Sequence, residues 1–226
     1  NQLREAERSL GNYHILAIPG GFSYGDDVAS GKILAIELTS FLGDALQKFV
    51  AKGGLVLGIC NGAQVLVEAG LVPAPVGMPA TGGDTVDVAL ARNRMPDRTG
   101  YYTRWVWCRI EESACVFTRG LEPGTLLPLP VAHGEGRFTS LHKGRLAELA
   151  AAGQAPLRYA RADGAPADAF PDNPNGADAA VAGLCNLRGN VLALMPHPER
   201  AAELGQLSRA VGGEWGQRRD RALASR

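Results

Sequence analysis

Hydrophobic positions in the first third of the chain fall into short continuous runs and a longer stretch with helical spacing. The run Tyr13–Ile18 stops at Pro19-Gly20-Gly21, which predicts a buried strand ending in a glycine-rich loop. From Ile33 to Val50, apolar residues recur every three or four positions, which predicts an amphipathic helix. The next run, Leu55–Ile59, predicts a second buried strand. The chain therefore begins with a strand, a helix and another strand.

A second helix follows directly. The second strand leads through Cys60 into the helical stretch Ala63–Ala69, and Gly70 suits the C-terminal cap of that helix. Strands that alternate with helices are typical of a parallel sheet covered by helices. We therefore predict an α/β fold with an open, mostly parallel sheet flanked by helices.

The second half of the chain has a different pattern. Residues Trp105–Ile110 and Thr125–Val131 are strand-like, whereas the stretch Gly153–Ala180 is rich in turn-forming residues and predicts an excursion or long loop. The runs Val181–Leu184 and Val191–Met195 flank a short turn, which predicts a hairpin. We expect these elements to form an antiparallel excursion from the parallel sheet.

The domain organisation is predicted to be simple. A length of 226 residues is compatible with one α/β domain, and we assign it to residues 1–208. Residues 209–226 contain several arginines and few apolar positions, so we expect a solvated C-terminal tail.

Charge and cysteine content exclude several classes of function. Lys plus Arg and Asp plus Glu are 23 each, so the formal net charge is zero, which disfavours a nucleic-acid or acidic-membrane binder. No apolar run approaches about 18 residues, so no membrane-spanning helix is expected. The four cysteines form no CxxC pair and match no zinc spacing, so we expect no metal site. They are most simply reduced thiols in a cytoplasmic protein.

Cys60 lies in the sequence Gly-Ile-Cys-Asn-Gly, between the second predicted strand and the helix that follows it. Glycines on both sides of a nucleophile at such a position are typical of a tight strand-to-helix turn. The turn would expose the sulfur and aim the helix N-terminus at it, which favours the thiolate. It would also free the backbone N–H of Asn61 to stabilise an oxyanion. A buried packing cysteine is the alternative, and Cys60 alone does not decide between the two.

His197 and Glu199 follow the last apolar run, in the sequence Met-Pro-His-Pro-Glu. In an extended segment, residues two apart point to the same side, so the carboxylate could orient the imidazole. His197 would then exchange a proton with Cys60. Taken alone, the pair is better explained as a surface-loop histidine beside an acid. Together with the cysteine turn, the catalytic interpretation becomes the better one.

Two glycine-rich loops are further candidates. Gly20 and Gly21 end the first strand, and their backbone N–H groups could face a site at the carboxyl edge of the sheet. A phosphate loop would need Lys followed by Ser or Thr, so nucleotide binding here is weakly supported, and a plain turn is an alternative. His133 lies in His-Gly-Glu-Gly-Arg, which could contact a substrate or a partner, although a solvated hairpin turn would look similar.

Five segments together resemble one known family. They are PGGFSYGD (Pro19–Asp26), GICNGAQ (Gly58–Gln64), AHGEGRF (Ala132–Phe138), NPNG (Asn173–Gly176) and MPHPERA (Met195–Ala201). The cysteine and His-Pro-Glu motifs are similar to those of class I glutamine amidotransferases, which have a flavodoxin-like fold. The other segments narrow the resemblance to the glutaminase subunits of phosphoribosylformylglycinamidine synthase, an enzyme of purine biosynthesis. The resemblance covers nearly the whole chain.

The resemblance implies a role for each matching residue. Cys60 would be the nucleophile, His197 the general acid and base, and Glu199 the orienting carboxylate. Gln64 would contact glutamine, as His133 would, and oxyanion donors would come from Asn61 and the Gly20-Gly21 loop. Such subunits hydrolyse L-glutamine to glutamate through a cysteinyl thioester.

The resemblance also implies partners. Ammonia would pass to a large synthetase subunit that uses ATP and Mg²⁺ to convert formylglycinamide ribonucleotide to formylglycinamidine ribonucleotide. A small accessory subunit is also expected, and no cofactor is expected in this subunit. Family members open with a further strand and helix, so that segment is expected before Asn1. Without it, residues 1–226 expressed alone are expected to be insoluble or inactive.

Three other functions compete with this interpretation. The chain could serve a different ammonia acceptor within the same class, or act as a free cysteine hydrolase with the same turn. It could also be a non-catalytic subunit that only docks a partner. The combination of Cys60, His197 and Glu199 argues against that last function.

Overall fold

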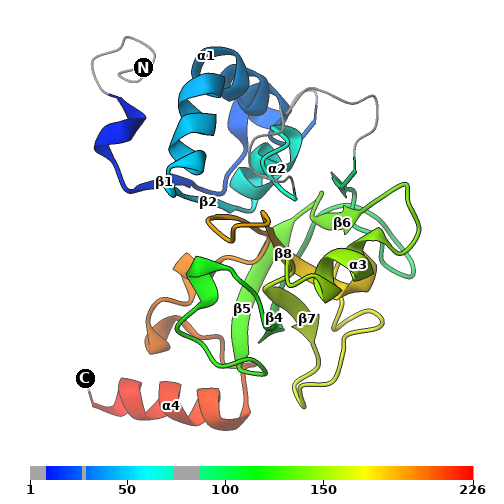
Figure 1. Ribbon diagram of the computed structural model, residues 1–226. Helices are drawn as coiled ribbons and strands as arrows, with labels where there is room; N and C mark the ends of the chain where they lie inside the picture. The colour runs from blue at the N-terminus through cyan, green and yellow to red at the C-terminus, as the bar shows by residue number, and fades with distance from the viewer. Residues whose placement is uncertain (1–8, 27–28, 74–86, 226) are drawn as a thin grey trace.

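The protein is described by a computed structural model that covers residues 9–26, 29–73 and 87–225. Its main feature is a sheet of seven strands in the order β1-β2-β9-β8-β7-β4-β5. Figure 1 shows α1 and α2 beside the β1–β2 end of this sheet, with α4 at the opposite end of the molecule. The strand and helix expected before Asn1 would lie outside the described residues.

The parallel part of the sheet consists of β1 (Ile15–Ile18), β2 (Leu55–Ile59) and β9 (Val191–Leu194). β2 lies in the middle and pairs in parallel with both neighbours, with Ile18 beside Gly58 and Ile59 beside Leu194. Every residue of β9 is buried, as is typical of a strand covered on both faces. The carboxyl ends of these three strands therefore meet at one edge of the sheet.

The remaining strands are antiparallel. β8 (Val181–Cys185) forms the expected hairpin with β9, and β7 (Leu157–Ala160), β4 (Tyr102–Ile110) and β5 (Leu126–His133) extend the sheet beyond it. The expected α/β class with an antiparallel excursion is thus confirmed. The sheet is mixed, and its three parallel strands lead to the segments that contain Gly20, Cys60 and His197.

The helices agree closely with the hydrophobic pattern. α1 (Lys32–Ala51) extends one residue beyond each end of the predicted helix, and α2 (Asn61–Glu68) begins two residues before the predicted start. Gly70 has φ 66°, the left-handed conformation expected of a C-terminal cap. α2 contacts β1, β2 and β9, and α1 packs on α2.

A small two-stranded sheet, which was not expected from the sequence, brings two distant segments together. β3 (Ala89–Ala91) pairs antiparallel with β6 (Arg137–Thr139), and α3 (Arg145–Ala151) follows β6. The pairing places the loop after β3, which contains Asn93, beside the turn between β5 and β6. Asn93 therefore lies close to His133 at the end of β5.

The expected long loop at residues 153–180 contains a strand of the main sheet. β7 lies between β8 and β4, and both Leu157 and Tyr159 are almost fully buried. The strand has only four residues, and turn-forming residues flank it on both sides. Its apolar run was too short to stand out against that composition.

Most of the described C-terminal residues are exposed, as expected of a solvated tail, but they form a helix that was not expected. Residues Gly213–Ala224 form α4, and its Trp215 indole donates a hydrogen bond to the Leu126 carbonyl (2.9 Å). Arg219 is buried because its guanidinium donates to the carbonyl oxygens of Ser208 and Val211. A polar composition thus concealed a helix that is held by hydrogen bonds rather than by an apolar face.

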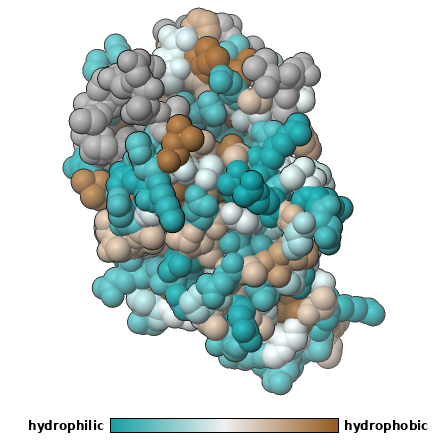
Figure 2. Space-filling view, turned by 90° about the vertical axis from the view of Figure 1, so that its right-hand side faces the viewer, coloured by the Kyte–Doolittle hydropathy of each residue, from teal (hydrophilic) through white to brown (hydrophobic). Residues whose placement is uncertain are grey.

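On the face shown in Figure 2, hydrophilic residues predominate and hydrophobic residues form small separate patches. None of the described helices is long and apolar enough to span a membrane.

Candidate functional site

Cys60 occupies the turn between β2 and α2. Its backbone has φ 50° and ψ −104°, a conformation that is costly for any residue except glycine. The Cys60 N–H donates to the Leu194 carbonyl on β9 (2.8 Å), so the neighbouring strand holds the turn in place. Such strain persists only where the surrounding structure fixes it, and it is typical of functional sites. The predicted nucleophile turn is therefore present.

The glycines around Cys60 are required by close packing. A Cβ atom added at Gly62 would lie 2.0 Å from the Ile18 carbonyl oxygen. One added at Gly58 would lie 2.4 Å from the carbonyl oxygen of Gly62. The turn can be this tight because neither residue has a side chain, which is the reason inferred from the sequence pattern.

His197 and Glu199 form the expected pair. The His197 Nδ1 lies 2.5 Å from a Glu199 carboxylate oxygen, and the His197 N–H donates to the Pro130 carbonyl on β5 (2.8 Å). The segment is not extended as expected, because Pro198–Arg200 turn into a short 3₁₀ helix. The turn still brings the carboxylate to the ring. The His197 side chain is 3% exposed and that of Glu199 is 47% exposed.

This pairing fixes the tautomer of His197. A carboxylate only accepts hydrogen bonds, so the proton of the neutral ring lies on Nδ1. The other ring nitrogen, Nε2, is buried and has no hydrogen-bond partner among the described residues. Nε2 is therefore available to take a proton.

Gly20 brings the glycine-rich loop, the cysteine and the histidine together. A Cβ atom added at Gly20 would lie 2.8 Å from Cε1 of His197 and 3.3 Å from Cβ of Cys60. Both side chains therefore approach the Gly20 backbone from different strands. The neighbouring Gly21 has φ 140°, which L side chains rarely adopt.

Asn61 and Gln64 connect this loop to α2 and to a third segment. Asn61 Oδ1 accepts from the Ser23 N–H (3.2 Å), and its Nδ2 donates to Gln64 Oε1 (3.0 Å). Gln64 Nε2 in turn donates to the Glu135 carbonyl (2.6 Å). Both ends of the Gln64 amide are thus engaged with the protein and hold the His-Gly-Glu-Gly loop at the site.

His133 is buried at the end of β5, and its neighbour Ala132 has its carbonyl oxygen 3.7 Å from Cys60 Sγ. Burial, followed by the nearby charge of His197, lowers the pKa of His133 to about 3. His133 is therefore neutral at physiological pH. Its Nδ1 lies 3.1 Å from Asn93 Oδ1, and its Nε2 has no partner among the described residues.

Two further residues at this site, Asn93 and Ser23, are not marked by any pattern in the sequence. Asn93 is fully buried beside His133, and no motif or spacing marks it. Ser23 lies within the PGGFSYGD segment, but nothing in that pattern distinguished it from its neighbours. Across the described residues, three buried side-chain polar atoms lack a hydrogen-bond partner: Ser23 Oγ, His133 Nε2 and His197 Nε2. All three come from segments of the site, which indicates a place for a polar ligand.

The other three cysteines have no comparable setting. Cys108 is fully buried on β4, and burial raises the pKa of its thiol. Cys115 and Cys185 are also buried, and the Cys185 thiol donates to the Gly153 carbonyl (3.9 Å). Among the described residues, no group of His, Cys, Asp and Glu is arranged to hold a metal ion.

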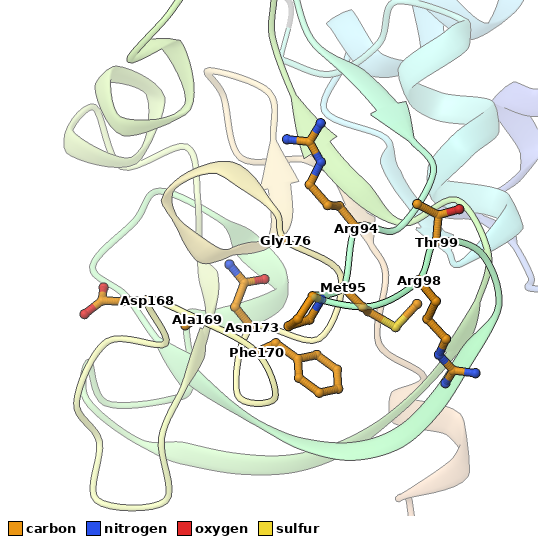
Figure 3. A pocket seen from close by; sticks show the side chains of 10 residues that line it. Arg94, Met95, Arg98, Thr99, Asp168, Ala169, Phe170, Asn173 and Gly176 are labelled. Atoms are coloured by element: carbon orange, nitrogen blue, oxygen red, sulfur yellow. The ribbon is translucent and has the colours of Figure 1, made fainter.

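A separate cavity of about 570 Å³ is lined by residues from 94–99, in the loop after β3, and from 168–176. Figure 3 shows Arg94 and Arg98 on one side of it, with Met95 and Phe170 between them and Asp168. Among the described residues that line it, none belongs to the cysteine–histidine site.

The fold and the site define the class of this protein. A buried cysteine on a strand-to-helix turn lies close to a histidine that is paired with a glutamate, and both follow strands of a mixed sheet. Residues 1–223 match the family model of the CobB/CobQ-like glutamine amidotransferase domain. The chain belongs to the PurQ family, the glutamine amidotransferase subunits of phosphoribosylformylglycinamidine synthase.

Its relatives match over most of their length. The chain is 43% identical over 213 residues to the phosphoribosylformylglycinamidine synthase subunit PurQ of Thermomicrobium roseum, which covers 94% of this chain and 78% of the relative. It is 40% identical over 208 residues to the same subunit of Treponema denticola, covering 88% of this chain and 75% of the relative. A solved structure of PurLQS from Thermotoga maritima matches with a TM-score of 0.65 and 30% identity, covering 97% of this chain and 82% of that chain. The resemblance stated from the motifs is confirmed.

Proposed function

We propose that Cys60, His197 and Glu199 carry out the glutaminase reaction of this subunit. The observation that carries the proposal is the convergence at Gly20, where a single added Cβ atom would contact both Cys60 and His197. The short bond between His197 and Glu199 supports it, because it leaves Nε2 of the imidazole free to serve the thiol.

In the proposed reaction, His197 Nε2 takes the thiol proton and Cys60 Sγ attacks the carboxamide carbon of L-glutamine. The tetrahedral oxyanion collapses as the C–N bond breaks, and His197 gives its proton to the departing nitrogen. Ammonia leaves, and a γ-glutamyl thioester remains on Cys60. Water, activated by His197, then attacks the thioester, so that glutamate and the free thiol form.

The oxyanion is expected to be held by backbone donors. Cys60 is the N-cap of α2, and the N–H groups in the first turn of a helix have no carbonyl partner earlier in that helix. Gly20 and Gly21 bring a second stretch of backbone to the same place. Preorganised N–H groups at such positions are the usual stabilisers of acyl-transfer intermediates. Gln64 and His133 complete the proposed glutamine site.

The ammonia is proposed to pass to a synthetase partner. The similar Thermotoga maritima structure is described as PurLQS, so PurQ is accompanied there by two further components. We infer that this chain also works with a large synthetase subunit and a small accessory subunit. ATP and Mg²⁺ would be used by the synthetase, which converts formylglycinamide ribonucleotide to formylglycinamidine ribonucleotide.

The test is a Cys60→Ala variant assembled with its synthetase partner. Glutamine-dependent synthesis should be abolished, whereas synthesis from added ammonium chloride should be retained, because the acceptor reaction needs ammonia and not the thiol. Cys115→Ala, which removes a buried cysteine outside the site, is the matched control and should keep both activities. Substantial glutamine-dependent turnover by Cys60→Ala would refute the proposed nucleophile.

A further inference from the structure

Asn93 is the centre of a closed hydrogen-bond network beneath the site. It is fully buried in the loop after β3. Its Nδ2 donates to the carbonyl oxygens of His133 (2.7 Å) and Gly100 (3.0 Å). Its Oδ1 faces the Gly136 N–H (2.9 Å) and His133 Nδ1 (3.1 Å). The Asn93 backbone N–H also donates to the Gly134 carbonyl (2.9 Å), so one residue grips the His-Gly-Glu-Gly turn at several points.

These partners fix the orientation of the Asn93 amide. Carbonyl oxygens only accept hydrogen bonds, so the atom facing the carbonyls of His133 and Gly100 must be the nitrogen. The atom facing the Gly136 N–H must then be the oxygen, which can only accept. His133 Nδ1 faces that same oxygen, so it is the protonated nitrogen of the ring. The neutral imidazole therefore has a bare lone pair on Nε2.

The bare Nε2 is buried and has no partner among the described residues. A buried acceptor without a donor is costly, so its retention points to a ligand that supplies an N–H or O–H group. The ring also rests against Gly136, where an added Cβ atom would lie 2.2 Å from His133 Cε1. Asn93 on one side and Gly136 on the other leave the ring with a single orientation.

The charge of each nitrogen group of glutamine indicates which one donates a hydrogen bond to His133 Nε2. Glutamine has two nitrogen groups, the α-ammonium and the carboxamide. A cation is better bound by a carboxylate than by a neutral imidazole, whereas the neutral N–H of a carboxamide suits a neutral acceptor. The carboxamide is also the group that Cys60 attacks, and the Cys60 sulfur lies 3.7 Å from the carbonyl oxygen of the residue before His133.

We propose that Asn93 is a positioning residue that fixes His133 as the Nδ1–H tautomer, so that His133 Nε2 accepts a hydrogen bond from the carboxamide nitrogen of glutamine. This role rests on the proposed glutaminase function and deepens it. A neutral acceptor beside the reacting nitrogen orients the carboxamide and carries no proton that could convert departing ammonia to ammonium. His197, which is paired with a carboxylate, supplies the proton of the reaction.

The test compares glutamine with glutamate γ-methyl ester, whose leaving group has no N–H to donate, in the complex with the synthetase. Asn93→Ala should lower kcat/KM for glutamine about tenfold, as expected for one lost hydrogen bond, and leave that for the ester nearly unchanged. His133→Ala removes the acceptor but keeps the backbone contacts of Asn93, so it should show the same selectivity if Asn93→Ala does not fold. Asn186→Ala, which removes a buried asparagine from the β8–β9 turn, is the matched control and should affect both substrates equally.

A second measurement reads the tautomer directly. In the full chain labelled with ¹⁵N-histidine, His133 should show a protonated Nδ1 and an unprotonated Nε2 from pH 5 to 8, and Asn93→Ala should lose this fixed pattern. A protonated Nε2, or equal losses on both substrates in Asn93→Ala and His133→Ala, would overturn the proposal. These results test the proposal on Asn93 and His133 separately from the glutaminase proposal, which is tested by Cys60→Ala.

Discussion

Two histidines at the site have the same tautomer but different partners. His197 Nδ1 faces a carboxylate, and His133 Nδ1 faces a neutral amide oxygen. A carboxylate stabilises the protonated imidazole, whereas an amide gives no such compensation for burial. The pKa of His133 is accordingly lowered to about 3, chiefly by burial. The His133 ring is thus neutral and can only accept a hydrogen bond at Nε2, whereas the His197 ring is paired with a carboxylate.

The first residue-scale prediction concerns the pair His197 and Glu199. His197→Ala should reduce glutaminase activity nearly as far as Cys60→Ala, because the nucleophile and its base act as one unit. Glu199→Gln should be milder, about 10- to 100-fold in kcat, because its amide oxygen still accepts the Nδ1 proton but no longer stabilises the imidazolium. Glu199 is nearly half exposed, so water already screens part of its charge. Near-normal rates in His197→Ala at neutral pH would mean that another group is the base.

Residues of the site differ in how far the sequence reveals them. Cys60 is recognisable because the tight turn needs glycines two positions before and after it, and that spacing is visible in the sequence. His197 and Glu199 are recognisable because only Pro198 lies between them, so the pair stands out in a short segment. The contacts of Asn93 with the site are made to His133 and Gly136, which lie 40 or more positions away, so no local pattern could reveal its role.

Helices and strands also differ in how well the sequence predicts them. β2 matches the predicted range and α1 extends it by one residue at each end, because both have an apolar pattern that local physics determines. β7 and α4 were not predicted. β7 is stabilised by the strands on either side of it, and α4 by hydrogen bonds to carbonyl groups elsewhere in the chain. Such stabilisation comes from tertiary contacts and leaves little trace in hydrophobic periodicity.

A pair of glycine substitutions tests the packing of the helices. Gly62→Ala should destabilise the protein by about 1–3 kcal/mol, because the added Cβ meets the backbone of Ile18 and cannot be relieved by a side-chain rotation. Gly43→Ala in α1, where no atom lies within 4 Å of the added Cβ, should stabilise it by about 0.5–1 kcal/mol. Urea denaturation measures both. Equal effects of the two substitutions would contradict the close approach of α2 to β1.

At the scale of the whole molecule, acid stability should depend on His133. Its folded pKa of about 3 lies below the ordinary value of 6.5, so between these pH values the unfolded chain binds the proton more strongly. Stability therefore falls as the pH drops below 6.5, by about 2 kcal/mol at pH 5 from this residue. His133→Gln should flatten the difference in unfolding free energy between pH 7.5 and pH 5.

The control for this effect is His14→Gln, which removes an exposed histidine. It should leave the pH dependence of the unfolding free energy unchanged. An identical pH dependence in wild type and His133→Gln would show that His133 titrates normally in the folded protein. Comparing variants rather than reading the wild-type curve alone separates His133 from the carboxylates, which also titrate in acid.

The position of β9 has a consequence for synthesis of the chain on the ribosome. β9 is inserted between β2 and β8, and it leads directly to His197, which follows Cys60 by more than half of the chain. A nascent polypeptide that has emerged only as far as α2 presents the thiol without its base, and the carbonyl that holds the Cys60 N–H has not yet been made. Glutamine cleavage should therefore begin only after β9 and His197 have emerged, so that shorter nascent chains do not release ammonia.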